Sequence, residues 1–168
     1  VTTIGAGAFA YCHSLKEFKG KFAADNGRCL IKDNTIIAYA EASGTEYTIP
    51  DSVTTIGDGA FNYCLSLTSI TIPDSVTTVG DGAFYWCSNL TSVTIGDSVT
   101  TIGYWAFYEC YSLTSVYCKA TTPPSIGYGV FSVNANSRKI YVPTASVNDY
   151  KTADGWRDYA DDIVGYDF

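Results

Sequence analysis

Apolar and polar residues follow a pattern along this chain that repeats every 23 residues. The segment VTTIGDGAFNYCLSLTSITIPD begins at Val53, returns as VTTVGDGAFYWCSNLTSVTIGD at Val76, and returns again as VTTIGYWAFYECYSLTSVYCK at Val99. A fixed period of this length is typical of leucine-rich repeats, in which each repeat forms one coil of a solenoid. The sequence therefore predicts a stack of similar coils.

Each repeat places its apolar residues at the same offsets, so that neighbouring coils can cover one another. One coil has no second layer, whereas adjacent coils with strands ~4.8 Å apart turn each apolar position into a ladder. Leu67 to Ile72 alternates apolar and polar residues, which predicts a strand, and the glycines around Asp58 predict a turn followed by a short helical turn. We therefore expect a mostly β solenoid with parallel strands in chain order. The apolar positions of the model coil are Val53, Ile56, Ala60, Phe61, Cys64, Leu67, Ile70 and Ile72.

The N-terminal part of the chain departs from the regular period. Residues 1–18 match the repeat as a first coil, whereas residues 20–46 interrupt it. The interruption contains two β-rich runs around Asp33-Asn34, which predicts a β-hairpin insert between coils at about Phe22–Tyr39. We expect the solenoid to resume at Tyr47. The insert is either an extended repeat or local cap, or a protruding contact element.

The C-terminal part also departs from the period. Residues 122–143 match an altered last coil, and residues 144–168 lose the repeat altogether. Because a repeat array must cover the apolar face of its final coil, we expect residues 144–168 to form a C-terminal cap, helical with a final short strand. Asp161 and Asp162 are expected to face water, and residues 1–168 to form a single domain. The residues expected to cover the stack are Val147, Tyr150, Trp156, Tyr159 and Ile163.

Composition narrows the classes of function. The 168 residues carry a net charge of −7, which argues against nucleic-acid binding and against an anionic membrane surface. No apolar run approaches the ~20 residues of a membrane-spanning helix, so we expect no membrane insertion. The chain has no Met and opens within a repeat, so we expect a mature or excised piece of a longer protein.

Six cysteines and one histidine raise the possibility of disulfides, a metal site or a catalytic group. Cys12, Cys64, Cys87 and Cys110 share one apolar repeat position, and Cys118 replaces an isoleucine. We expect buried, reduced thiols, because parallel Cβ vectors suit a disulfide poorly. No CxxC pair is present and His13 stands alone at a variable, solvated position, so no zinc site and no hydrolytic triad are expected.

Aspartates also recur at fixed repeat positions. Asp51, Asp74 and Asp97 form one row, and Asp58 and Asp81 form a shorter one. Aligned carboxylates can hold calcium, but Asp beside Gly, Pro or Ser is also ordinary turn and capping chemistry. We expect no metal and no cofactor. Because no polar constellation and no cleft are evident, we expect a protein that is not an enzyme.

The strands present two predicted outward-facing rows. Toward the C-terminal end, the second row changes from threonine to tyrosine, and Tyr joins a large apolar area to a polar tip. We therefore take Thr71, Thr94, Tyr117, Lys139 and Tyr141 as candidate binding residues. The competing interpretation is that the cap folds back over the two rings. The rows are Glu17, Glu46, Ser69, Ser92, Ser115, Lys139 and Lys19, Thr48, Thr71, Thr94, Tyr117, Tyr141.

A second aromatic group lies on the predicted turn side of the coils. Two interpretations remain open for it, namely packing between the turns or exposure for binding. The group consists of Tyr63, Tyr85, Trp86, Trp105 and Tyr108.

The repeat resembles that of a known family. IPDSVTTIGDGAFNYCLSLTSITIP follows the pattern IPxxVxxIGxxAFxxCxxLxxIxIP, and in this it is similar to the BspA-like leucine-rich-repeat proteins of bacterial surfaces, from the first residue to about Pro143. Ser52, Ser75 and Ser98 stand where the LxxLxLxxN form of the repeat has asparagine, so no asparagine ladder is expected.

The resemblance carries expectations about location and partners. It implies a cell-surface or secreted protein of bacteria that binds a protein partner, either a host matrix protein or another bacterial surface protein. The expected function is that of a non-enzymatic binding or adhesion module, monomeric in this segment. The alternative is a passive spacer that holds another domain away from the cell envelope.

Overall fold

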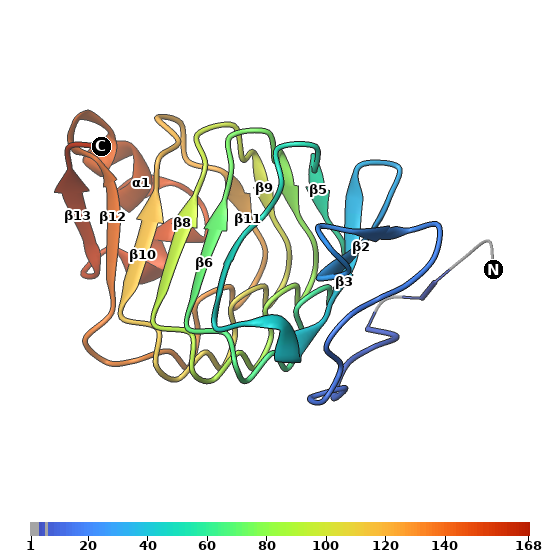
Figure 1. The fold of residues 1–168 in the computed structure, drawn as a ribbon. Coiled ribbons are helices and arrows are strands. Elements are labelled where there is room, and N and C mark those ends of the chain that lie inside the picture. Colours follow the sequence, from blue (N-terminus) through green and yellow to red (C-terminus); the bar gives the residue numbers. More distant parts are fainter. Residues whose placement is uncertain (1–3, 6) are drawn as a thin grey trace.

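The computed structural model of the chain describes residues 4–5 and 7–168. They wind into a solenoid whose coils stand side by side, with strands on two opposite sides (Figure 1). The predicted leucine-rich-repeat solenoid is thereby confirmed. Residues 1–3 and 6 of the expected first coil lie outside the described part. No helix in the described ranges combines the length and apolar character that a bilayer crossing requires.

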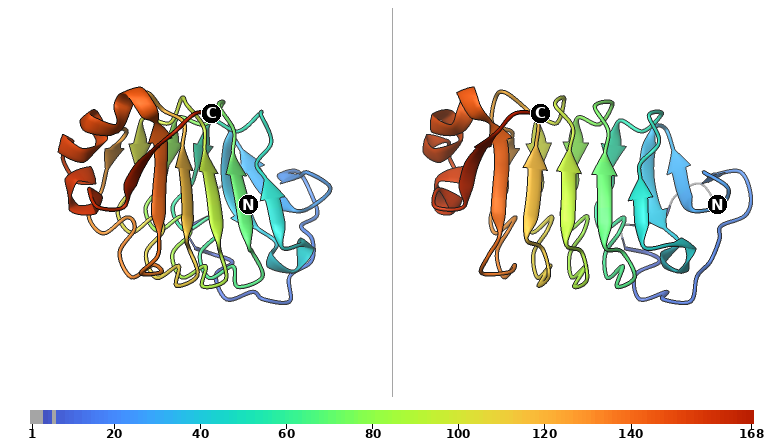
Figure 2. Two further views of the ribbon diagram at one scale, coloured as in Figure 1. Left: turned by 90° about the vertical axis from the view of Figure 1, so that its left-hand side faces the viewer. Right: turned by 60° about the vertical axis from the view of Figure 1, so that its left-hand side comes forward.

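Six strands form a parallel sheet that follows the order of the chain, as the repeat predicts. Neighbouring strands lie side by side along the whole stack (Figure 2). Side chains alternate along each strand, so that in β6 Ile70 and Ile72 are buried while Ser69 and Thr71 face outward. The strands are β4 (Glu46–Thr48), β6 (Ser69–Ile72), β8 (Ser92–Ile95), β10 (Ser115–Cys118), β12 (Lys139–Pro143) and β13 (Ile163–Tyr166).

A second sheet of seven strands lies on the other side of the coils, and the sequence pattern did not reveal it. Most of its strands are two residues long, and two residues carry too little alternation to be recognised. β3 and the strands after it pair in parallel, whereas β1, β2 and β3 pair in antiparallel fashion. The strands are β1 (Ala23–Ala24), β2 (Cys29–Lys32), β3 (Thr35–Tyr39), β5 (Thr55–Ile56), β7 (Thr78–Val79), β9 (Thr101–Ile102) and β11 (Ser125–Ile126).

The segment after each short strand forms consecutive β-turns, where the sequence predicted a short helical turn. Asn62 N donates to Gly59 O at 3.0 Å and Cys64 N to Phe61 O at 3.1 Å, while Phe61 N donates to Ala83 O of the next coil at 2.8 Å. A helix would use these amides within its own backbone. The inter-coil bonds therefore favour turns, and they hold Tyr63 at a φ of 60°.

The core consists of ladders that run through the stack. The rings of Phe61, Phe84, Phe107 and Phe131 stack with centroids 4.8, 4.9 and 5.6 Å apart. Beside them a cysteine ladder is buried as predicted at Cys64, Cys87 and Cys110, and Cys118 is buried as predicted at the isoleucine position of its strand. Cys87 Sγ donates to Phe61 O at 3.1 Å, and Cys110 Sγ to Phe84 O at 3.2 Å. Burial raises the pKa of Cys110 to about 12 and that of Cys118 to about 11.

The interruption at residues 20–46 ends earlier than the sequence indicates. β2 and β3 form an antiparallel hairpin joined at Asp33-Asn34, but Thr35 and Ile36 already pair in parallel with β5 of the next coil. The solenoid therefore resumes at Thr35, and not at Tyr47. This coil is shorter than a regular coil, which hides the 23-residue period. Thr35 pairs with Thr55 and Thr48 with Thr71, yet 13 residues separate the first member of each pair and 16 the second. η1 (Glu41–Ser43) shortens this coil.

The first coil packs on the stack without joining the six-stranded sheet. Glu17 and Lys19 lie outside every strand, so their predicted place in the outward rows is wrong. The reason is that Phe18 belongs to a separate cluster with Leu30, Ala38 and Ala40, formed with the antiparallel hairpin. Cys12, predicted to be buried, is exposed for the same reason.

His13 is partly exposed, but it is not simply solvated as predicted. Its Nδ1 lies 2.5 Å from Glu41 Oε2, and the Glu41 carboxylate is buried. The other oxygen, Oε1, accepts from Leu65 N at 2.7 Å and from Ser66 N at 3.1 Å. Glu41 therefore ties the first coil to the turn of a regular coil.

Residues 144–168 close the C-terminal end of the stack. η2 (Thr144–Ser146), α1 (Val147–Thr152) and η3 (Trp156–Tyr159) precede β13. Tyr150 and Trp156 are completely buried, and Trp156 Nε1 donates to Pro124 O at 2.7 Å. Asp162, expected to face water, instead pairs with the buried Arg138 at 2.5 Å. Arg138 also donates from Nη1 to Phe131 O and to Asn134 Oδ1, while its buried Nε has no partner among the described residues.

Candidate binding surface

The outward rows of the six-stranded sheet align as the sequence predicts from the second coil onward. Strand register pairs Thr71 with Thr94, Thr94 with Tyr117, and Tyr117 with Tyr141. Lys139 lies at the end of the other row, paired with Ser115, and shares the outer face with Tyr141 two residues away. The structure therefore brings all five candidate residues onto one face. Thr71 and Lys139 are exposed, whereas Thr94, Tyr117 and Tyr141 are half-buried.

The two tyrosines at the C-terminal end form the centre of a larger cluster. The rings of Tyr117 and Tyr141 stack with centroids 4.7 Å apart and planes 13° from parallel. Tyr166 packs edge-on against both at 5.5 and 5.6 Å, and Phe168 packs against Tyr166 at 5.0 Å. We call these four residues the tyrosine cluster. Tyr166 and Phe168 are 43% and 53% exposed, so the C-terminal segment flanks the pair and itself adds open aromatic surface.

Tyr166 and Phe168 were not among the predicted binding residues, although the sequence carried one signal for them. The final short strand was predicted within the cap, and its place beside β12 sets Tyr166 opposite Pro143. Extending the outward rows by one more strand would have placed Tyr166 near Tyr141. The repeat pattern gave no register for this strand, because residues 144–168 no longer follow the period.

Threonine side chains secure the flank of this sheet. Oγ1 of Thr68, Thr91 and Thr114 donates to the backbone carbonyl oxygen of the preceding coil at 3.0, 2.9 and 3.3 Å. The same carbonyls also accept backbone amides of the next coil, so each hydroxyl adds a further bond at the point where the chain enters a strand. The hydroxyl ladder thus reinforces the backbone bonds that join the coils behind the outer face.

The aspartate rows have a structural role in the stack. Asp81 N donates to Asp58 Oδ1 at 2.9 Å, Tyr104 N to Asp81 Oδ1 at 2.8 Å, and Asp97 N to Asp74 Oδ1 at 3.0 Å. These bonds are the turn and capping chemistry that the sequence offered as an alternative to calcium. Within the described ranges, no group of three or more His, Cys, Asp or Glu residues is placed to hold a metal ion.

The second aromatic group lies along the turn edge of the coils and is both packed and exposed. Tyr63 stacks on Trp86 at 5.6 Å and Tyr85 on Tyr108 at 5.6 Å, with these four rings half-buried. Trp105 is 47% exposed. Tyr11 joins the group, with its ring centroid 4.0 Å from that of Tyr63. The two tyrosines hold the same repeat position, in AFAYC and AFNYC, but the interruption at residues 20–46 separates their coils in the sequence, so their contact was not predicted.

Several solved structures share this architecture, among them those of three bacterial proteins. A leucine rich cell surface protein of Faecalibacterium prausnitzii A2-165 is 24% identical over 98% of this chain and 45% of its own length, with a TM-score of 0.69. A leucine-rich repeat protein of Eubacterium ventriosum is 30% identical over 87% of this chain and 41% of its own (TM-score 0.65). One of Bacteroides capillosus is 25% identical over 73% of this chain and 99% of its own (TM-score 0.62).

The chain thus spans less than half the length of two of these proteins. No curated protein matches it. The family model of the BspA type leucine rich repeat region matches residues 35–152 with six copies, beginning at the threonine where the solenoid resumes. Repeat, fold and family model agree, and the chain belongs to the BspA-type leucine-rich repeat family.

Proposed function

We propose that this chain is a non-enzymatic protein-binding module of a bacterial surface protein, and that it binds through the outer face of the six-stranded sheet. The observation that carries the proposal is the tyrosine cluster at the end of the Ser/Thr rows. Tyr117 stacks on Tyr141 at 4.7 Å, where the preceding coils have Thr71 and Thr94. Threonine already favours a strand, so strand formation does not require the rings.

The chemistry of this face suits a protein partner. The Ser/Thr rows offer hydroxyl groups that donate and accept, and the tyrosine cluster offers apolar area with polar tips. Lys139 adds one positive charge beside the rings, while its Nζ reaches Asp161 O at 3.5 Å. Interface hot spots commonly combine aromatic anchors with a polar surround.

Family and neighbours support a surface location. The Faecalibacterium prausnitzii neighbour is described as a cell surface protein. We propose the same location, or secretion, for this chain, with a host matrix protein or another bacterial surface protein as partner and a monomeric state. Residues 1–168 would act as one unit with residues 144–168 as its cap. The second candidate is a passive spacer, which the regular, ladder-stabilised middle of the stack would also serve.

The test compares the paired substitution Tyr117→Thr with Tyr141→Thr against a matched control. Immobilised purified host matrix proteins are titrated with the full chain and with each variant. Tyr128→Thr is the control, since it removes a ring that is 76% exposed elsewhere. We expect the paired variant to bind about tenfold more weakly, because two anchors are lost, and the control to bind unchanged. Unchanged binding by the paired variant would reject this face, and no binding by the full chain would favour the spacer.

A further inference from the structure

Aromatic rings and carboxylates line a groove of about 470 Å³ on the turn edge of the stack. The turns run along the lower edge of Figure 1, on a different side of the coils from the candidate face. Tyr11, Tyr63, Tyr85 and Trp105 supply the rings, Asp58 and Asp81 the carboxylates, and Gly59 and Gly82 part of the wall. We call this the turn-edge groove.

Both charged residues that line this groove, Asp58 and Asp81, are acidic. From Asp33 to Cys118 the sequence contains no Lys and no Arg. Asp33 lies 4.0 Å from Lys32 and Glu41 pairs with His13, whereas the other carboxylates of the stretch have no ion pair among the described residues and make the surface of the middle coils negative. The nine acidic residues in the stretch are Asp33, Glu41, Glu46, Asp51, Asp58, Asp74, Asp81, Asp97 and Glu109.

The groups in the groove are suited to a cation that also donates hydrogen bonds. Asp58 and Asp81 each use Oδ1 to accept an amide of the next coil, and neither pairs with a cation among the described residues. The face of a tyrosine or tryptophan ring attracts positive charge through its quadrupole. Partial burial and the nearby charge of Glu109 raise the pKa of Tyr85, which is consistent with a negative field at this edge.

Trp105 indicates that the groove is more than a by-product of packing. It stands where the two preceding coils have Gly59 and Gly82, and it adopts a φ of 54°, a conformation that strains a residue with a side chain. Gly129 lies against it, and a Cβ at Gly129 would come within 2.9 Å of Trp105 Cδ1. A large, 47% exposed ring is thus kept at a position that glycine fills without strain.

We propose that the turn-edge groove binds an extended, arginine-bearing segment of a partner protein. A guanidinium group stacks on an aromatic face and donates to a carboxylate at the same time, so it uses both kinds of group that line the groove. The proposal goes beyond the binding face described above, because it concerns a different edge of the coils and a partner selected by charge.

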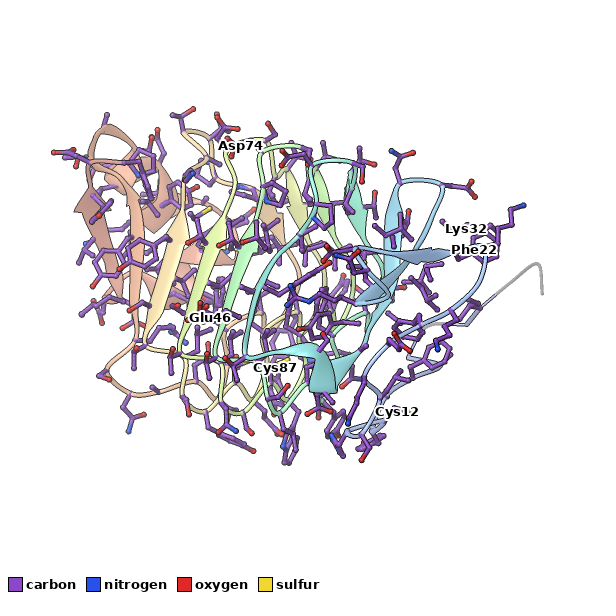
Figure 3. All side chains as sticks on the ribbon, viewed as in Figure 1. Cys12, Phe22, Lys32, Glu46, Asp74 and Cys87 are labelled. Atoms are coloured by element: carbon purple, nitrogen blue, oxygen red, sulfur yellow. The ribbon has the colours of Figure 1, made fainter. Side chains whose placement is uncertain are left out.

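The test uses an octapeptide of alternating arginine and glycine, titrated calorimetrically into the full chain. The same peptide with citrulline in place of arginine is the neutral comparison, and the neutral oligosaccharide cellohexaose probes the alternative ligand class. The variant Asp58→Asn with Asp81→Asn keeps both Oδ1 acceptors and removes two charges. Its matched control is Asp74→Asn with Asp97→Asn, which also removes two charges. The control keeps the Oδ1 acceptor of residue 74 for the amide of residue 97. It lies at the opposite edge of the coils, where Asp74 is labelled in Figure 3.

We expect the arginine peptide to bind in a salt-sensitive manner and the citrulline peptide to bind at least about tenfold more weakly. Asp58→Asn with Asp81→Asn should lower the affinity for the arginine peptide about tenfold. Trp105→Gly should lower it about fivefold, because it removes a cation–π contact of ordinary strength. The control at Asp74 and Asp97 should change affinity less than about twofold, as its charges lie at the opposite edge of the coils and solvent ions screen them.

Several outcomes would overturn the proposal. They are equal binding of the two peptides, an equal loss in the Asp74 and Asp97 control, binding of cellohexaose alone, or no binding of any probe. Melting temperatures of all variants check folding, and Trp105→Gly should not lower stability because it restores the residue of the preceding coils. Tyr117→Thr with Tyr141→Thr should leave the peptide affinity unchanged, so the failure of one surface is distinguishable from the failure of the other.

Discussion

The ring of Phe84 stacks on the ring of Phe107 with centroids 4.9 Å apart and planes only 2° from parallel. At this point of the core, one coil is therefore related to the next by almost a pure translation, with very little rotation. Each ring is covered by its equivalents on both sides, and neither ring has any exposed surface. The ladder is thus the feature of the core that a substitution should disturb most.

Phe84→Ala should lower the free energy of unfolding by about 3–5 kcal/mol, because it removes a buried ring and leaves a cavity between two rigid coils. Denaturant unfolding followed by circular dichroism measures the change. Tyr128→Ala, which removes a ring that is 76% exposed, is the control and should change stability by less than about 0.5 kcal/mol. Equal effects of the two substitutions would contradict the ladder as the main source of stability.

Gly103→Ala should destabilise the stack, because a Cβ at this position would lie 2.3 Å from Asp81 Oδ1 and 2.6 Å from Asp81 N. The coils would have to separate, which breaks the bond between Asp81 and Tyr104 N. We expect a loss of roughly 1–3 kcal/mol in denaturant unfolding, as for other overpacked sites. Gly5→Ala, where nothing lies within 4 Å, is the matched control and should be neutral.

Arg138→Ala should cost roughly 2–4 kcal/mol, since it removes a buried cation and leaves the Phe131 carbonyl and Asp162 without their donor. The exposed pair of Arg157 and Asp154 provides the comparison, and Arg157→Ala should cost less than about 1 kcal/mol. A small effect at Arg138 would show that the cap does not depend on this ion pair.

Stability should fall as pH rises above 9. Burial raises the pKa of Cys118 to about 11 and that of Cys110 to about 12, so the folded chain holds these protons after the unfolded chain has lost them. Their contribution is complete below the unfolded pKa and disappears as pH rises toward the folded value. Cys118→Val should reduce the loss at pH 10 by on the order of 1–2 kcal/mol. An unchanged pH profile in this variant would contradict the assignment.

Thiol accessibility should separate Cys12 from the other cysteines. Cys12 is exposed and the other five are buried, and no disulfide joins the described cysteines. An aromatic disulfide reagent should therefore titrate one thiol quickly in the native chain and six in denaturant without reductant. Two or three missing thiols in denaturant would indicate disulfides and would contradict the buried ladder.

The regular coils were predictable because each apolar position repeats with the same neighbours above and below it. Ile70, Phe84 and Cys110 could be assigned to the core from spacing alone, and the register that joins Thr71 to Tyr117 followed from the same period. Tyr141 lies 24 residues after Tyr117 and was placed from the strand motif around it. A ladder position depends on equivalent residues one period away, and this information is local to the sequence.

The irregular parts were not predictable in the same way. The coil at residues 35–50 is shortened, so that Tyr39 takes the place of a phenylalanine and packs on Phe61 at 5.1 Å. The bond between His13 and Glu41, and the pair of Arg138 and Asp162, join positions 28 and 24 residues apart outside the register. The turn-edge groove depends on the first coil in a similar way, because Tyr11 reaches Tyr63 across the interruption at residues 20–46 and not at the 23-residue period.

The carboxylate of Asp58 accepts a hydrogen bond from the amide of Asp81, and the carboxylate of Asp81 accepts one from the amide of Tyr104. At both boundaries the earlier coil thus carries the acceptor for the coil that follows it. Every boundary between regular coils is thus interchangeable. An in-frame duplication or deletion of one repeat, such as residues 76–98, would rejoin chemically equivalent surfaces and change the height of the stack by ~4.8 Å. Recombination between repeats within the gene can therefore change the length of such a protein in unit steps and leave both of its ends intact.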